Sequence, residues 1–137
     1  IRRCLVGSEM CIRDRCTGGE PLLQLDSDLI SAFKEEGFYI AIETNGTLPA
    51  PKGIDWICMS PKANTNIKLK SGNEIKVIHP QENYDPNDFM SFDFDDFYIQ
   101  PMDSKSYSKN LKASLDFCMQ NPRWSLSLQT HKILGIK

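Results

Sequence analysis

The sequence has no long apolar run, no run of basic residues and no Cys-x-x-Cys pair. A membrane-spanning helix needs about 20 consecutive apolar residues, so none is predicted. The formal net charge of −2 argues against a nucleic-acid groove or a surface for anionic membranes. The five cysteines fit neither a disulfide framework nor a Cys-x-x-Cys metal site, so we expect reduced thiols in a cytoplasmic protein.

The beginning of the chain differs from the rest in having no hydrophobic period. Residues 4–15 look like the in-frame translation of a transposase sequencing adapter, so we expect residues 1–15 to be an artefactual, disordered leader. The alternative is that Cys4, Cys11 and Cys16 hold an iron–sulfur cluster, but their spacing matches no established pattern. The remaining residues are enough for one domain with a hydrophobic core.

Strands alternate with helices along this domain. Leucine spacing predicts a helix from Leu22 to Phe33, with Asp26 as a cap and Gly37 as a stop, and a second helix from Tyr107 to Gln120. Segments 64–73 and 80–92 are expected to be mostly loop. Strands are predicted over residues 38–42, 54–59, 74–78, 96–99 and 124–129. This order indicates an α/β fold with a mostly parallel sheet.

Each predicted strand leads directly into polar residues. Carboxyl ends of parallel strands line the ligand site of a barrel or an open sheet, so we expect one wide polar pocket. The polar clusters are Thr17–Glu20, Glu43–Gly46, Ser60–Lys62, His79–Gln81, Gln100–Asp103 and Gln129–Lys132.

Taken singly, these residues leave simpler interpretations open. Gly18 and Gly19 can form a plain tight turn, Glu43 can pair with a lysine, and Lys62 can be a solvated loop residue. A lone histidine such as His131 is more often structural than catalytic. The side chains expected in the core are Cys58, Cys118, Trp56 and Trp124.

Together, the clusters resemble the 7-carboxy-7-deazaguanine synthase family of radical S-adenosylmethionine enzymes. Glycines let a backbone approach a ligand closely, and a carboxylate can meet the ammonium group of the cofactor's methionine end. Gly-Gly-Glu alone indicates only a radical enzyme, whereas Ser-Pro-Lys, Gln-Pro-Met-Asp and Gln-Thr-His-Lys narrow the resemblance. The segments that carry it are CTGGEPLLQLD, IAIETNGTLP, IDWICMSPKA, GNEIKVIHPQ, FYIQPMD and WSLSLQTHKILGIK.

The resemblance implies an incomplete, modified (β/α)6 radical S-adenosylmethionine barrel, of which residues 16–137 would be the C-terminal part, and a homodimer. It also implies a lyase reaction that converts 6-carboxy-5,6,7,8-tetrahydropterin to 7-carboxy-7-deazaguanine with loss of ammonia, on the route to queuosine. S-adenosylmethionine, a 4Fe–4S cluster and Mg²⁺ take part, and a flavodoxin-type protein is the expected reductant. No direct nucleic-acid or membrane partner is expected.

The same resemblance implies roles for particular residues. Substrate binding is implied for Thr17, His131 and, through its carboxylate, Lys137. Cofactor binding is implied for Gly19, Glu20, Glu43, Asn45, Ser60, Pro61, Lys62, Gln100, Pro101, Met102 and Asp103. Two alternatives remain, a different radical enzyme such as a glycyl-radical activase and a non-catalytic α/β binding module.

The sequence departs from the family in its metal ligands. The cluster cysteines and the magnesium threonine of the family lie upstream of Gly-Gly-Glu and are not found here, so we expect this polypeptide to hold no cluster and to be inactive. Iron analysis after anaerobic reconstitution tests this expectation. About four irons per chain would contradict it.

Overall fold

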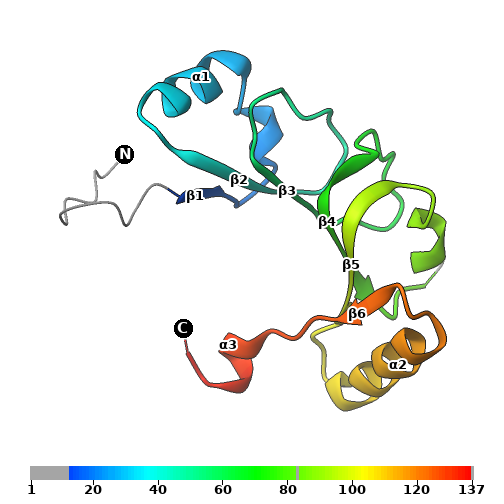
Figure 1. Ribbon diagram of the computed structural model, residues 1–137. Coiled ribbons are helices and arrows are strands. Elements are labelled where there is room, and N and C mark those ends of the chain that lie inside the picture. Colours follow the sequence, from blue (N-terminus) through cyan, green and yellow to red (C-terminus); the bar gives the residue numbers. More distant parts are fainter. Residues whose placement is uncertain (1–12, 83, 137) are drawn as a thin grey trace.

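The chain folds as a curved sheet with two helices on its convex side (Figure 1). A computed structural model provides the structure and describes residues 13–82 and 84–136. The elements are β1 (Arg13–Cys16), η1 (Pro21–Leu23), α1 (Ser27–Glu35), β2 (Tyr39–Thr44), β3 (Trp56–Met59), β4 (Ser71–His79), η2 (Pro86–Phe89), β5 (Asp93–Pro101), α2 (Tyr107–Gln120), β6 (Trp124–Leu126) and α3 (Thr130–Ile133).

All six strands are parallel and lie in chain order, from β1 at one edge to β6 at the other. Each strand must therefore be followed by a connection that returns the chain to the other end of the strands, where the next strand begins. Helix α1 provides the connection between β1 and β2, and α2 provides the one between β5 and β6. Consequently every strand ends at the same edge, which confirms the predicted α/β fold.

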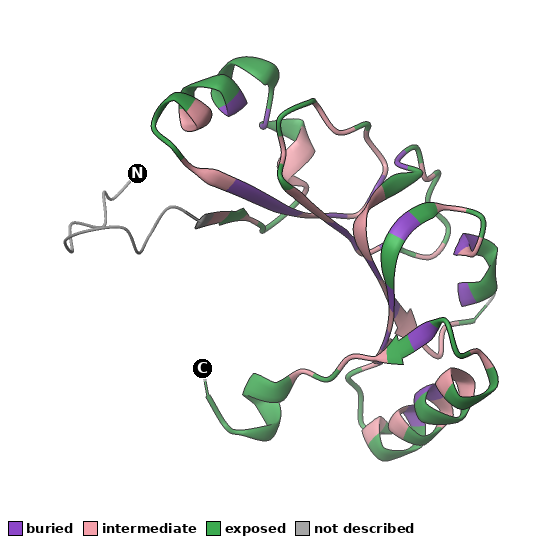
Figure 2. Ribbon diagram, viewed as in Figure 1, coloured by how far each residue is buried: buried purple, intermediate pink, exposed green. Residues whose placement is uncertain are grey.

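The two faces of the sheet differ in chemistry. Alternate residues of a strand point to opposite faces: Ile75 and Val77 of β4 are fully buried, while Glu74 and Lys76, which alternate with them, are not. The convex face carries the core, in one cluster around β4 and β5 and a smaller one that joins α1 to β2. Figure 2 shows the buried residues concentrated in the middle strands. The sheet therefore has an apolar side under the helices and a more polar, concave side.

The first predicted helix is shorter than expected. Leu22 lies in the 3-10 turn η1, and α1 begins only at Ser27 because the Asp26 carboxylate caps it, accepting a hydrogen bond of 2.9 Å from the Leu29 amide. Gly37, with φ of +78°, ends the helical segment as predicted. Helix α2 has the predicted bounds.

Several strand boundaries also differ from the prediction. Strand β4 begins at Ser71 and β5 at Asp93, both earlier than expected, whereas β6 ends at Leu126. At Gly72, an added Cβ would lie 2.6 Å from Cε1 of Phe94, so the absence of a side chain lets strands β4 and β5 pair this far. A glycine in a polar stretch gave no signal of this extension.

The expected leader overlaps the sheet. Strand β1 begins at Arg13 and pairs with β2 from Arg13↔Tyr39 to Cys16↔Ile42, so residues 13–15 belong to the fold. The prediction of disorder is therefore wrong for residues 13–15. Residues 1–12 lie outside the described residues.

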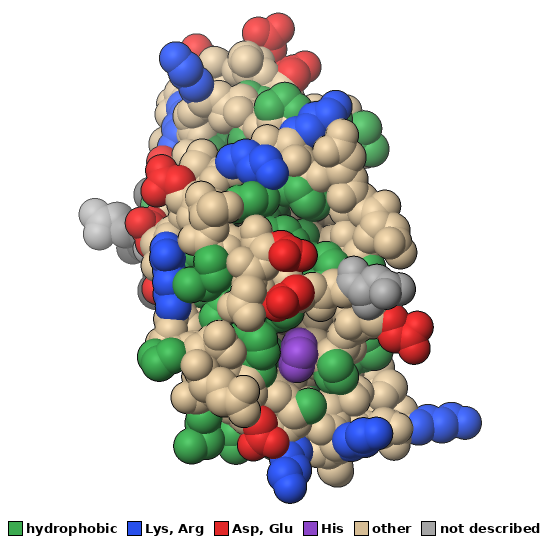
Figure 3. Space-filling model, turned by 90° about the vertical axis from the view of Figure 1, so that its right-hand side faces the viewer, with side chains coloured by type: hydrophobic (Ala, Val, Ile, Leu, Met, Phe, Trp, Pro, Cys, Tyr) green, Lys and Arg blue, Asp and Glu red, His purple; other side chains and the backbone are tan. Residues whose placement is uncertain are grey.

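The outer surface carries charges of both signs. Figure 3 shows acidic, basic and hydrophobic side chains interspersed on the face that lies to the right in Figure 1. Among the described residues, no helix is both long enough and apolar enough to span a membrane.

Replacing Ile75 tests the position of the core. This side chain is fully buried in β4, so we expect Ile75→Ala to lower the free energy of unfolding by about 2–5 kcal/mol. Ile133→Ala is the matched control, because Ile133 is exposed and its truncation should change stability by less than about 0.5 kcal/mol. Urea unfolding measures both, and equal effects would contradict the assignment of the core.

Candidate functional site

The polar segments that follow the strands lie along one edge of the sheet, as predicted. Backbone hydrogen bonds continue the sheet by one residue past the strand ends: the Ser60 amide donates to the Thr44 carbonyl at 2.7 Å, and the Met102 amide donates to the His79 carbonyl at 2.8 Å. The first residue after each of these strands is thus held in register with its neighbour. Because all strands of the sheet are parallel, the segments after β1 to β6 form a row, which we call the carboxyl rim.

Glu20 connects the first two segments of the rim. Its Oε1 accepts hydrogen bonds from Oγ1 of Thr44 at 2.6 Å and from the Leu22 amide at 3.1 Å, and its Oε2 accepts one from the Asn45 amide at 2.8 Å. Charge-assisted hydrogen bonds of this kind are stronger than neutral ones. Glu20 is consequently a brace between the ends of β1 and β2 as well as a predicted ligand residue.

The glycines before Glu20 leave open space beside the backbone. Gly18 has φ of +99°, a conformation that glycine adopts without strain, and its amide donates to Oγ1 of Thr17 at 2.6 Å. A Cβ added at Gly18 or Gly19 would meet no atom within 4 Å. The turn interpretation and the ligand interpretation are therefore compatible, since the turn exposes the backbone at Gly19.

After β2, the side chain of Asn45 shapes a turn. Its Oδ1 accepts hydrogen bonds from the amide of Thr47 at 2.9 Å and from its hydroxyl at 2.7 Å. Gly46 follows with φ of +79°, and an added Cβ would lie 2.4 Å from Sδ of the buried Met59. The oxygen of Asn45 is thus committed to the turn, and only its amide nitrogen is left for the predicted cofactor contact.

The segment after β3 presents a hydroxyl and an ammonium group. Nζ of Lys62 lies 3.4 Å from Oγ of Ser60, and Lys62 is exposed. Pro61 between them is fully buried, so its side chain packs in the protein and cannot face solvent. Within this predicted triplet, Ser60 and Lys62 are the residues able to contact a ligand through their side chains.

The segment after β5 has a similar division. Pro101 is fully buried, and the Met102 carbonyl accepts a hydrogen bond of 2.8 Å from Nδ2 of Asn110. Asp103 is exposed and forms an ion pair with Lys132 of α3. Gln100, which precedes Pro101 in the chain, is half-buried.

Of the predicted substrate residues, two are exposed. Thr17 lies directly after β1, and His131 lies on α3. Lys137 lies outside the described residues. The structure therefore puts the predicted residues of the β1 end on the carboxyl rim and His131 on the segment that follows β6.

The concave side of the sheet holds two ion pairs that were not predicted from the sequence. Nη1 of Arg15 lies 2.7 Å from Oε1 of Glu43, and Nζ of Lys76 lies 2.8 Å from Oε1 of Glu74. Strand register puts Glu43, Cys58 and Glu74 side by side, so these side chains share one face. Glu43 thus pairs with an arginine of the expected leader. The alternation of Glu74 and Lys76 with buried residues was the available signal.

Ionisation on this concave face is governed by burial and by Glu74. Burial raises the pKa of the Cys58 thiol to about 12, and the Glu74 carboxylate adds to this effect, so Cys58 stays a neutral thiol. Burial, the largest single effect, lowers the pKa of Lys76, but the hydrogen bond to Glu74 and the nearby charges of Glu74 and Glu43 together outweigh it, so the pKa is raised. Lys76 is therefore a charged ammonium at neutral pH.

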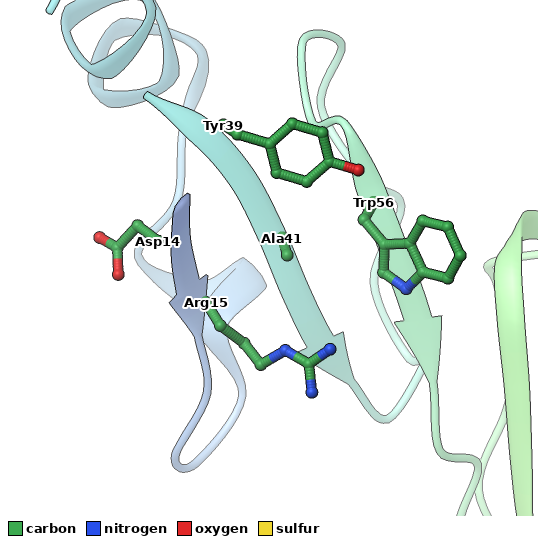
Figure 4. A pocket seen from close by; sticks show the side chains of 5 residues that line it. All are labelled: Asp14, Arg15, Tyr39, Ala41 and Trp56. Atoms are coloured by element: carbon green, nitrogen blue, oxygen red, sulfur yellow. The ribbon is translucent and has the colours of Figure 1, made fainter. Parts of the chain in front are cut away.

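A cavity of about 310 Å³ opens on the same face. Figure 4 shows Tyr39 and Trp56 on one side of the strands and Arg15 reaching across β2 below them. The cavity is lined by Asp14, Arg15, Tyr39, Ala41 and Trp56.

The prediction of four core side chains is confirmed in part. Cys58 and Trp124 are buried as predicted, whereas Trp56 and Cys118 are only partly buried.

The class defined by this architecture is that of parallel α/β proteins, which bind their ligands at the carboxyl ends of the strands. No protein-family model matches the chain. The 7-carboxy-7-deazaguanine synthase of Caulobacter vibrioides is 50% identical over 121 residues, which are 88% of this chain and 58% of that protein. The synthase of Burkholderia multivorans is 52% identical with the same coverage. That of Bacteroides thetaiotaomicron is 39% identical over 121 residues, 88% of this chain and 63% of that protein.

These similarities show that the chain belongs to the 7-carboxy-7-deazaguanine synthase family. The chain spans about three fifths of the length of these relatives.

Removing one acceptor of Glu20 tests its role as a brace. In Glu20→Gln the amide group keeps one acceptor oxygen but sets an NH2 group against one of the donors, Thr44 or Asn45. We expect a loss of about 1–3 kcal/mol in the free energy of unfolding. Glu35→Gln, at an exposed position of α1, is the control and should change stability by less than about 0.5 kcal/mol. Chemical denaturation of both variants is the measurement, and equal stabilities would rule out the brace.

Proposed function

We propose that the chain provides the cofactor-binding and substrate-binding rim of a radical S-adenosylmethionine lyase. The reaction is the conversion of 6-carboxy-5,6,7,8-tetrahydropterin to 7-carboxy-7-deazaguanine with loss of ammonia, in queuosine biosynthesis. The supporting observation is the row of polar segments on the carboxyl rim of a chain that belongs to this family. No observation favours a glycyl-radical activase or a binding module over the synthase.

The rim fits the methionine end and the ribose of S-adenosylmethionine. Open space lies beside Gly18 and Gly19, where a ligand can approach the protein backbone closely. The Ser60 hydroxyl can bond to ribose oxygens, and the Lys62 ammonium can bond to a carboxylate. Glu20 presents a carboxylate already fixed by three hydrogen bonds, so binding an ammonium group there costs little further ordering. When bound, S-adenosylmethionine supplies the hydrogen-abstracting group of the reaction.

The described residues do not fit a 4Fe–4S cluster or a magnesium ion. Within residues 13–82 and 84–136, no three His, Cys, Asp or Glu side chains are grouped so that they could hold a metal ion. In this proposal the cluster and magnesium ligands belong to the part of the synthase that the chain does not match. The same proposal includes the (β/α)6 barrel, the homodimer, the cytoplasmic location and the flavodoxin-type reductant.

On the substrate side, the chain's own residues contribute charge and shape. Thr17 and His131 are exposed and able to donate or accept hydrogen bonds to a pterin. The charged groups of the concave face are paired with each other, so they offer a polar wall to a polar substrate without an uncompensated buried charge. Both features favour a polar substrate over an apolar one.

A chimera tests this proposal. This chain would be joined to the part of the Caulobacter vibrioides relative that it does not match, reconstituted anaerobically with iron and sulfide, and assayed by mass spectrometry for 7-carboxy-7-deazaguanine. We expect product. The proposal would be contradicted by a chimera that folds and binds four irons but forms no 7-carboxy-7-deazaguanine, while the relative itself is active.

Within the same chimera, Lys62 tests the location of the cofactor. Removing a charged hydrogen-bond partner costs about 1.5–3 kcal/mol, so Lys62→Gln should raise KM for S-adenosylmethionine roughly 10- to 100-fold. Lys52→Gln, an exposed loop lysine, is the matched control and should leave KM unchanged. An unchanged KM in Lys62→Gln would remove Lys62 from the cofactor site.

A further inference from the structure

Helix α3 is attached to the fold in an unusual way. Every residue from Thr130 to Ile136 is exposed, and Figure 2 shows α3 standing apart from the sheet and from α2. Apolar residues in this segment are no exception, with Ile133, Leu134 and Ile136 each more than half exposed. Packing of apolar side chains therefore does not hold α3 in place.

Backbone hydrogen bonds do not hold it either. The last one that links this part of the chain to the sheet is donated by the Ser127 amide to the Ile99 carbonyl, at 2.8 Å. Beyond it, the backbone bonds are local, such as those from Leu134 to Thr130 and from Ile136 to His131. The helix could therefore swing about residues 128 and 129 unless a side chain restrains it.

One side-chain contact spans the gap. Among the residues that the structure describes, the ion pair between Nζ of Lys132 and Oδ2 of Asp103 is the hydrogen bond or salt bridge that connects α3 to the loop between β5 and α2. It bridges a cavity of about 350 Å³ lined by Asp103, Tyr107, Gln129, Lys132 and Ile133. Both partners are about half exposed, so salt can screen the pair.

We propose that Lys132 is a positioning residue: its ion pair with Asp103 holds α3, and with it His131, against the carboxyl end of β5. The inference rests on the proposed function, in which Asp103 belongs to the cofactor side and His131 to the substrate side of one site. Lys132 joins these two sides. Because the restraint is one exposed pair, α3 is released when the charge of Lys132 is removed or screened.

The experiment measures the order of the α3 backbone in this chain by ¹⁵N relaxation. At low salt, the amides of Ile133 and Leu134 should have clearly higher order parameters than in Lys132→Gln, where they should fall below about 0.6, the range of a flexible backbone. Lys132→Arg should keep the order because it keeps the charge. Lys112→Gln, an exposed lysine of α2, is the control that removes the same charge elsewhere. In 1 M NaCl the unsubstituted chain should resemble Lys132→Gln.

Ordered amides in Lys132→Gln, or disordered ones in the unsubstituted chain at low salt, would overturn the proposal. The amides of α2 show in each sample that the chain is folded. In the chimera described above, Lys132→Gln should raise KM for the pterin about 2- to 5-fold at unchanged kcat, and Lys132→Arg should restore it. Loss of order with an unchanged KM would leave the ion pair standing as a restraint and would refute the placement of His131 in the substrate site.

Discussion

Parallel hydrogen bonding between consecutive strands is the constraint on which the rest of the structure depends. Because each strand pairs in parallel with the next one along the chain, every connection has to return to the end where the strands begin, and every strand finishes at the same end of the sheet. Bonds such as that from the Ser60 amide to the Thr44 carbonyl extend this register into the loops. Backbone pairing thereby brings residues that are far apart in the sequence together on the carboxyl rim.

The strength of attachment differs along the rim. The β1 and β2 ends are fixed to each other by the three hydrogen bonds of Glu20, and the β3 end is anchored by the buried Pro61. Helix α3, by contrast, is connected to the remainder of the described residues by the exposed ion pair of Lys132. The predicted cofactor residues thus lie on the rigid part of the fold, and His131 lies on the part that is easiest to displace. Such a division suits a site in which one ligand is bound on a preformed surface and the other is covered afterwards.

The sequence was sufficient for the architecture and for the row of polar strand ends, because parallel strands with apolar periodicity have few other arrangements. It was sufficient for the Asp26 cap and the Gly37 stop, since both depend on local chemistry. It did not reveal the pairing of Gly72 with Phe94 or that Arg15 reaches Glu43, because both contacts depend on residues distant in sequence. Likewise, the commitment of the Asn45 oxygen to its turn is visible only in three dimensions.

Two buried prolines also show what a sequence motif leaves undetermined. Pro61 and Pro101 belong to segments that resemble cofactor-binding motifs, yet their side chains are fully buried. Their fixed φ sets the direction of the backbone after β3 and β5, which presents Ser60, Lys62 and Asp103 instead. A motif therefore identifies a segment, while burial decides which of its members can contact a ligand.

The central claim is that the carboxyl rim, and not the concave cavity near Trp56, binds S-adenosylmethionine. A crystal structure of the chimera with S-adenosylmethionine tests it most directly. We expect the methionine end of the cofactor beside Gly18 and Gly19 and its ribose near Ser60. Density for the cofactor in the cavity lined by Tyr39 and Trp56, with the rim empty, would contradict the account.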